Sequence, residues 1–187
     1  MSKHEGSAPP RLWDRLGLDE KDVSVVKARF ESSMQPLSID GPALFDRLAQ
    51  TGSIKQALGV DVLLLEALYA RAFHLLEIEQ PLRATDVFGL LCALDSKQAD
   101  HWLGYGICLQ ACDEPGMALT AFDHAATLAP HWPAPHLHRL SLFMRQERWE
   151  EAREALRRLD DSAMDDADIP LLKAAVPFRT ALEMRET

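Results

Sequence analysis

The sequence predicts an all-α fold built from repeated helix pairs. An alanine followed four residues later by a large apolar side chain recurs three times, at intervals of 34 residues. The three pairs are Ala84 with Phe88, Ala118 with Phe122, and Ala152 with Leu156. Four-residue spacing places both side chains on one face of a helix, where alanine admits a neighbouring helix and the larger side chain fills the space beside it. Pro81 and Pro115 follow turn-like breaks, where proline can end one helix and open the next.

A period of 34 residues is that of the tetratricopeptide repeat, a pair of antiparallel helices with the pattern W-x2-L-G-x2-Y, A-x3-F and P. The second copy fits this pattern best, at Trp102, Tyr105, Gly106, Leu109, Ala118, Phe122, Ala125 and Pro130. The third copy is degenerate, with His136 at the usual tryptophan position and Leu140 at the usual glycine. We expect three tandem tetratricopeptide helix pairs with an N-terminal helical segment and a C-terminal capping helix.

The predicted elements follow one another along the chain in four parts. The N-terminal extension starts rich in Ser, Gly and Pro, so it is expected to be partly disordered or to hold short helices. A helical segment interrupted at Thr51-Gly52-Ser53 precedes the repeats, and a last helix with Pro170 in its first turn closes the stack. The predicted ranges are 1–40 for the extension, 41–64 for the helical segment, 65–98, 99–132 and 133–166 for the repeats, and 167–187 for the cap.

Composition narrows the classes of function. The chain has 187 residues, of which 47% are hydrophobic, enough for a folded domain with a core. No apolar stretch reaches the roughly 18 residues that span a bilayer, and the first ten residues lack the apolar core of a secretory signal, so we expect a cytoplasmic protein. A formal charge of −9 disfavours nucleic acid and anionic membrane as partners and suits a basic or apolar polypeptide.

No motif in the sequence indicates an enzyme, a cofactor or a metal site. Glycine-rich phosphate loops, G-x-S-x-G and H-E-x-x-H are absent from the sequence. The cysteines Cys92, Cys108 and Cys112 form no CxxC motif. The histidines His131, His136 and His138 straddle a turn between two repeats, so we interpret them as surface or packing residues rather than metal ligands.

Several stretches carry a resemblance to a known family. Residues 90–95 read LLCALD, residues 102–110 read WLGYGICLQ and residues 118–122 read ALTAF. With residues 45–54, they resemble the class II chaperones of bacterial type III secretion, the tetratricopeptide chaperones of hydrophobic translocator proteins. The resemblance covers about residues 43–187, and residues 1–40 are longer than the usual N-terminus of that family.

The first helix of each pair should line the concave side of a stack of repeats, with residues three or four apart on one face. This predicts a mostly apolar groove, and the resemblance implies that the groove holds an extended P-x-L-x-x-P segment of a translocator. The predicted groove residues are Tyr69, Phe73, Leu76, Leu103, Ile107, Gln110, Leu137, Ser141 and Met144. A site that clamps a terminal carboxylate is disfavoured, because Gln110 and Arg145 are the only obvious donors.

The resemblance further implies a homodimer formed through the helical segment before the repeats. The candidate residues for that interface are Leu44, Phe45, Leu48, Ile54 and Leu58. The predicted function is a bacterial cytoplasmic chaperone that covers apolar cargo segments and prevents their aggregation and premature association. Two alternatives stay open. One is a coactivator of an AraC-type transcription factor, and the other is a scaffold or needle-subunit co-chaperone whose groove does not bind P-x-L-x-x-P peptides.

Overall fold

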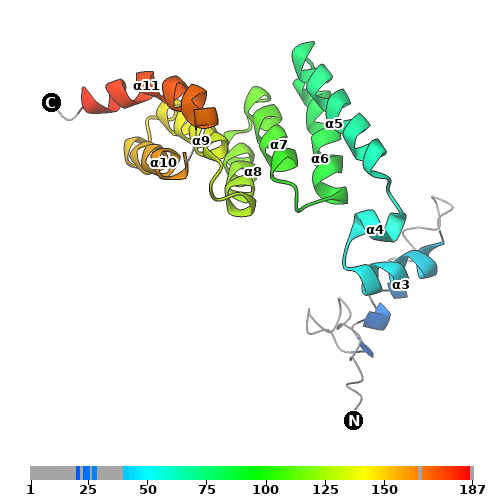
Figure 1. Ribbon diagram of the computed structural model, residues 1–187. Coiled ribbons are helices and arrows are strands. Elements are labelled where there is room, and N and C mark those ends of the chain that lie inside the picture. The colour runs from blue at the N-terminus through cyan, green and yellow to red at the C-terminus, as the bar shows by residue number, and fades with distance from the viewer. Residues whose placement is uncertain (1–19, 22, 26, 29–39, 164–165, 186–187) are drawn as a thin grey trace, which may run out of the picture. The chain divides into compact units, whose positions relative to one another are not determined.

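The computed structural model describes residues 20–21, 23–25, 27–28, 40–163 and 166–185. All regular secondary structure in these ranges is helical, which confirms the predicted all-α fold (Figure 1). The chain forms two compact units, one ending at Leu64 and the other beginning at Leu65. Most of the predicted extension lies outside the described residues, and its described residues before Asp40 are helical.

The first unit contains two short helices, α3 (Gly41–Thr51) and α4 (Ile54–Leu58). The backbone N–H of Ala43 donates to the Asp40 side chain over 3.1 Å, which caps the start of α3. Gly52 then ends α3 in the left-handed region at φ 63°, and the Ser53 side chain caps the start of α4. These local signals explain why the helical segment breaks where it does.

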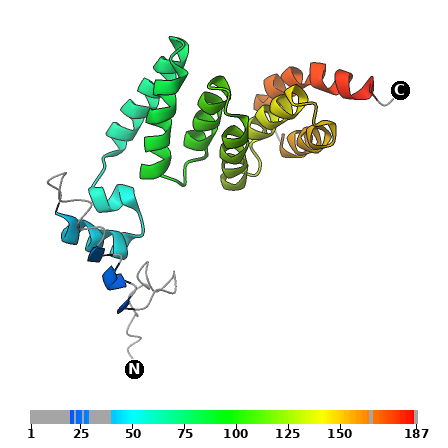
Figure 2. The ribbon, with the colours of Figure 1, turned by 180° about the vertical axis from the view of Figure 1, so that it is seen from behind.

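Three successive antiparallel helix pairs follow. They are α5 (Val62–Glu77) with α6 (Pro81–Leu94), α7 (Ala99–Ala111) with α8 (Pro115–Leu128), and α9 (Pro133–Arg145) with α10 (Trp149–Ser162). All but the first three residues of α5 belong to the second unit. The second helices begin at Pro81, Pro115 and Trp149, at the 34-residue interval. From α6 onward each helix packs against the next one in sequence, and Figure 2 shows the same succession from behind.

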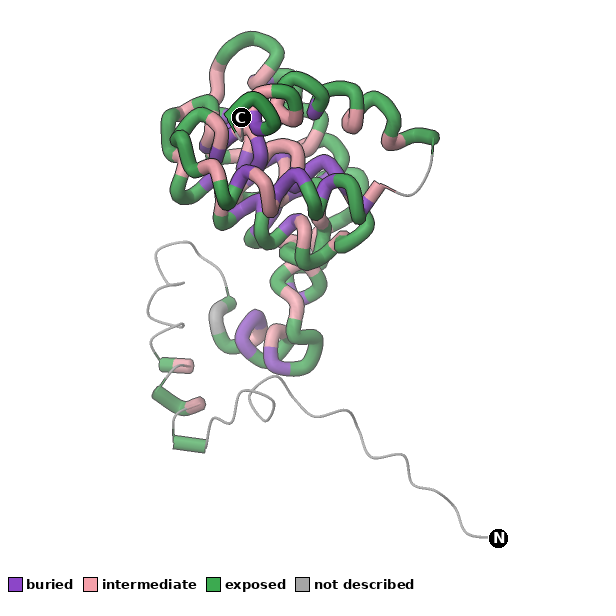
Figure 3. Tube along the Cα trace, turned by 90° about the vertical axis from the view of Figure 1, so that its left-hand side faces the viewer, coloured by how far each residue is buried: buried purple, intermediate pink, exposed green. Residues whose placement is uncertain are grey.

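The repeated alanines and large side chains form the interior of the stack (Figure 3). Ala84, Ala118 and Ala152 are completely buried. Phe88 and Phe122 are also completely buried, which agrees with the space-filling role expected from their position after the alanine. The repeated positions therefore belong to the buried core of each pair.

The three turns within the pairs share one backbone conformation. Glu79, Asp113 and Glu147 lie in the left-handed region at φ 55°, 60° and 58°. In each turn the following N–H donates to a carbonyl five residues earlier, as from Gln80 to Leu75 over 2.8 Å, which is the bond of a Schellman motif. The chain thus reverses in the same way in every pair, even where the proline that opens the next helix is replaced by Trp149.

The C-terminal helix α11 (Ile169–Glu183) follows the short 3-10 helix η2 (Asp166–Asp168) and packs against α9 and α10. Ala175 and Leu182 of α11 are buried in the core of the third pair. The Arg185 guanidinium lies 3.7 Å from the centroid of the Trp149 ring, a cation–π contact. No helix in the described ranges combines the length and apolarity needed to cross a bilayer.

Candidate functional site

The nine predicted groove residues occupy equivalent positions on α5, α7 and α9, the first helices of the three pairs. None of them is buried: Phe73 is 42% exposed and the other eight are partly exposed. Fully internal aromatic positions such as Phe88 and Phe122 have no exposed surface. The repeated face that these nine residues define is called the groove face below.

An aromatic cluster forms the part of the groove face that α5 contributes. The Tyr69 and Phe73 ring centroids are 4.9 Å apart, and both rings meet the buried Phe88 edge-on at 5.7 and 5.8 Å. Edge-to-face contacts of this kind fix ring orientation. Phe73 is therefore a core residue along one edge and a surface residue along the other, so the packing and binding interpretations both apply to it.

In the second and third pairs, the groove-face residues pack on buried clusters of the core. Leu103 and Ile107 pack against the buried cluster that contains Phe122. Leu137 and Met144 pack in the same way against the cluster that contains Leu140. Their partly exposed side chains are consequently held by a close-packed core, which preorganises the surface for a ligand.

Gln110 lines a cavity of about 160 Å³ together with Arg145, the other donor considered for a carboxylate clamp. Asp113 lines the same cavity. Its carboxylate would repel the carboxylate of a bound chain terminus, which reduces the suitability of this cavity as a clamp.

The predicted dimer residues fall into two groups. Leu44 and Phe45 are buried within the protomer, and Leu48 is partly buried. Ile54 and Leu58 on α4 are exposed apolar side chains. If this segment forms an interface, Ile54 and Leu58 are the residues that present free apolar surface to it.

The histidines of the third pair take up different surroundings. His138 stacks on the Phe122 ring at 5.2 Å, and burial lowers its pKa. His136 is buried and lines a cavity of about 490 Å³ that His131 also lines. Among the described residues, no three His, Cys, Asp or Glu side chains gather in an arrangement that could hold a metal ion.

Two further residues of that larger cavity, Arg139 and Arg158, were not predicted as site residues. They come from α9 and α10, and their positions follow no catalytic or binding motif. One sequence feature near them was informative: His136 stands where the repeat pattern has tryptophan. A smaller side chain at that position indicates a change in packing.

Comparisons with known proteins rest on structure alone. No protein-family model matches the chain, and no curated protein sequence matches it. A type III secretion complex from Aeromonas hydrophila matches with a TM-score of 0.69 and 22% identity, covering 78% of this chain and 97% of the other.

Two translocator chaperones match in complex with translocator segments. SycD of Yersinia enterocolitica, with a peptide of the translocator YopD, has a TM-score of 0.64 and 22% identity over 68% of this chain and 98% of SycD. PcrH of Pseudomonas aeruginosa, with the chaperone-binding region of PopD, has a TM-score of 0.65 and 24% identity over 69% of this chain and 98% of PcrH. SycD is also known in an alternative dimer. The chain therefore has the fold of the type III secretion translocator chaperones.

Proposed function

We propose that this protein is a cytoplasmic chaperone that binds an extended segment of a hydrophobic type III secretion translocator along the groove face. One observation carries the proposal: nine residues at equivalent positions of three successive pairs are accessible on a fold whose neighbours SycD and PcrH were crystallised with translocator segments. The groove face has the length of three repeats, which suits an extended peptide better than a compact ligand.

In the proposed mechanism the protein binds a cargo segment along the groove face and catalyses no reaction, so it is not an enzyme. An extended chain points alternate side chains to one side, and apolar side chains directed at the groove face would be removed from water against Phe73, Ile107 and Met144. Burial of apolar surface yields roughly 25 cal/mol per Å², and a few anchors supply most of it. While bound, these cargo segments cannot aggregate or associate prematurely, and the net charge of −9 keeps the complex in solution.

The test is a calorimetric titration of the full chain with a P-x-L-x-x-P peptide from a translocator encoded beside it. Phe73→Glu should abolish saturable binding, because it places a carboxylate on the apolar face. Leu90→Glu is the matched control: Leu90 is 46% exposed in the same pair, but it lies on the second helix, α6. Ser141→Arg should weaken binding independently, since it adds bulk and charge to the third pair.

Circular dichroism of each variant separates lost binding from lost fold, which matters for Phe73 because it packs on Phe88. Binding lost in both groove variants and kept in Leu90→Glu supports the proposal. A folded wild-type protein that does not bind the peptide would contradict the proposal and favour the scaffold or co-chaperone alternative.

A homodimer through α4 is part of the same proposal. Ile54 and Leu58 are exposed, and an exposed apolar pair is a common component of an interface. Ile54→Glu together with Leu58→Glu should convert a dimer to a monomer in sedimentation velocity. An unchanged sedimentation coefficient in the double variant would exclude this interface.

A further inference from the structure

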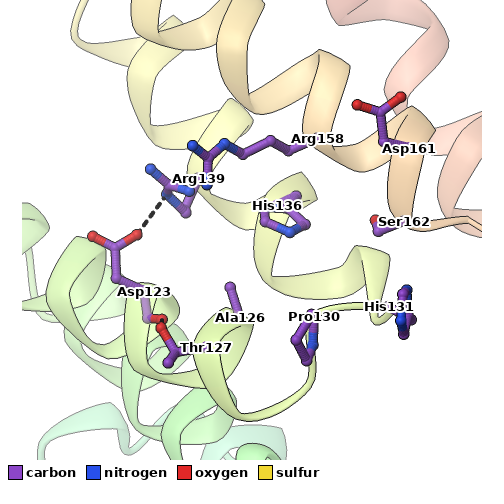
Figure 4. Close-up of a pocket in the computed structure, with 10 residues that line it drawn as sticks. All are labelled: Asp123, Ala126, Thr127, Pro130, His131, His136, Arg139, Arg158, Asp161 and Ser162. Atoms are coloured by element: carbon purple, nitrogen blue, oxygen red, sulfur yellow. Dashed lines mark hydrogen bonds and ion pairs between the residues drawn. The ribbon is translucent and has the colours of Figure 1, made fainter.

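A polar cavity of about 490 Å³ lies where the third helix pair meets the second (Figure 4). Helix α8, the turn after it, and helices α9 and α10 provide its walls. The groove face is formed by α5, α7 and α9, so most of the cavity wall belongs to other helices. A ligand bound in this cavity would be independent of the proposed cargo.

The second pair shows one way in which this position of the repeat is filled. Trp102 stacks on His124 with ring centroids 4.5 Å apart and meets Tyr105 edge-on at 6.4 Å. The indole Nε1 donates to the carbonyl of Ser96 over 2.9 Å. Three aromatic rings and one hydrogen bond therefore close the space between the helices in that pair.

The third pair replaces each of those three rings. Thirty-four residues after Trp102, Tyr105 and His124 stand His136, Arg139 and Arg158. An imidazole is smaller than an indole and leaves space unfilled, while two flexible cationic side chains take the places of flat rings. The cavity and its positive groups thus lie where the third pair differs from the second.

In Figure 4 the side chains of Arg139 and Arg158 lie on the same side of His136, and the charges of both act on its ring. Arg139 forms an ion pair from its Nε to Asp123 over 3.0 Å, and Arg158 forms one from its Nε to Glu154 over 2.7 Å. Both pairs use the Nε atom, so the terminal nitrogens of the forks are available. A ligand oxyanion could accept hydrogen bonds from these terminal nitrogens while both ion pairs stay in place.

His136 supplies a second, independent indication of a ligand. Only 5% of this residue is exposed, and its Nδ1 has no hydrogen-bond partner. Burial lowers the pKa of His136, the nearby Arg139 and Arg158 lower it further, and Asp123 acts in the opposite direction. An unpaired buried polar group is costly, so a ligand that completes its hydrogen bonding is favoured.

The acidic residues of the wall limit the size and charge of that ligand. Asp123 is already paired with Arg139, whereas Asp161 lies on the other side of His136, beside Ser162. A carboxylate there repels a large polyanion but leaves room for one small oxyanion near the guanidinium groups. The charges therefore disfavour nucleic acid and nucleotides.

We propose that this cavity binds a small oxyanion, a carboxylate or phosphate group, between the guanidinium forks of Arg139 and Arg158 and beside His136. Arginine forks match the geometry of carboxylate and phosphate oxygens, which single ammonium groups do not.

The experiment titrates the full chain with sodium glutarate in one arm and inorganic phosphate in the other, at an ionic strength held constant with chloride. The His136 ring signals are followed by NMR, assigned with His136→Gln, and the heat is measured by calorimetry. We expect a saturable change in at least one arm and a rise in the pKa of His136, because a neighbouring anion favours the imidazolium. The arm that saturates at lower concentration identifies the group.

Arg158→Gln should weaken binding about tenfold or more, as expected for loss of a charge-assisted hydrogen bond. Arg157→Gln is the matched control, because Arg157 pairs with the same Glu154 but does not line the cavity. Arg158→Lys keeps the charge and loses the fork, so its affinity should fall between those of the wild type and Arg158→Gln. Equal effects of the Arg157 and Arg158 variants, or a response that chloride alone reproduces, would overturn the proposal.

Discussion

Gly106 lies so close to the Phe122 ring that a Cβ atom on the glycine would overlap the phenyl carbons. Two residues earlier on the same helix, Gly104 meets the Phe88 ring equally closely. Residues two apart point to nearly opposite sides of a helix. Helix α7 is therefore held between two buried rings, one on α6 and one on α8, and glycine is required on both of its sides.

Gly106→Ala should destabilise the protein by about 1–3 kcal/mol, because the methyl group must displace a ring that has no free volume around it. Urea unfolding followed by circular dichroism measures the change. Gly116→Ala is the control, since nothing lies within 4 Å of a Cβ at that position on α8, and it should be neutral or stabilise by about 0.4–1 kcal/mol. Equal losses in both variants would contradict the close approach.

Truncation of the Leu182 side chain should weaken the packing of the C-terminal helix α11 and lower the unfolding free energy. Leu182 of α11 is buried with Leu140 and Leu159, so Leu182→Ala should cost about 2–4 kcal/mol through lost burial and the cavity left behind. Val176 is an exposed apolar residue on the same helix, and Val176→Ala should change the unfolding free energy by less than about 0.5 kcal/mol. Similar values for the two variants would show that α11 does not pack as a cap.

The stability of the third pair should fall between pH 7.5 and pH 5. Burial lowers the pKa of His138 from its usual 6.5, so in this range the unfolded chain binds more protons than the folded one. Stability is then lost as the pH drops below about 6.5, which is the direction for a histidine kept neutral by the fold. The exposed Glu151 and Glu154 have lowered pKa values, so their contribution changes only at more acidic pH.

His138→Gln should reduce this pH dependence, whatever its effect on stability at pH 7.5, and His136, whose pKa burial also lowers, contributes to the part that remains. The measurement is the urea unfolding free energy of both proteins at pH 7.5, 6.5, 5.5 and 5. A variant whose free energy declines as steeply as that of the wild type would disprove the contribution of His138.

Thiol labelling should distinguish the three cysteines. Burial raises the pKa of Cys92 and of Cys108 to about 12, so neither forms a thiolate near neutral pH. Cys112 is partly exposed, with its Sγ 3.7 Å from the Thr85 hydroxyl. A maleimide at pH 7.5 should label one thiol in the native protein and three in urea, as counted by mass spectrometry.

The control for this experiment is Cys112→Ser, which should remove the fast label and leave the fold intact. Rapid native labelling of Cys108 would contradict its burial.

The sequence was sufficient to predict the repeated helices because their signals are local and periodic. The spacing of Ala118 and Phe122, together with Pro115 at the start of a helix, places each pair without knowledge of its neighbours. The accessibility of the groove residues followed from the same register, since equivalent positions in a stack share one environment. Peptide binding at these positions stays a prediction.

Other features depend on contacts that no spacing reveals. The burial of Leu44 and Phe45 within the protomer could not be read from an amphipathic pattern, because an interface and a core both require apolar residues. The cavity beside His136 draws Arg139 and Arg158 from two different helices. The degenerate third repeat marked the position, but only the packed helices bring both side chains to one cavity.

The left-handed turns of the three pairs each place an acidic residue, Glu79, Asp113 or Glu147, where glycine would be least strained. Helices that alternate in direction bring these turns to a common edge of the stack, and the links between pairs to the other edge. An acidic residue therefore recurs along that edge at every repeat, and in the third turn Arg145 and Arg148 flank it. Two copies that met along the turns at Glu79 and Asp113 would set like charges opposite one another, so lateral self-association of the stacks is opposed at these two turns by electrostatic repulsion.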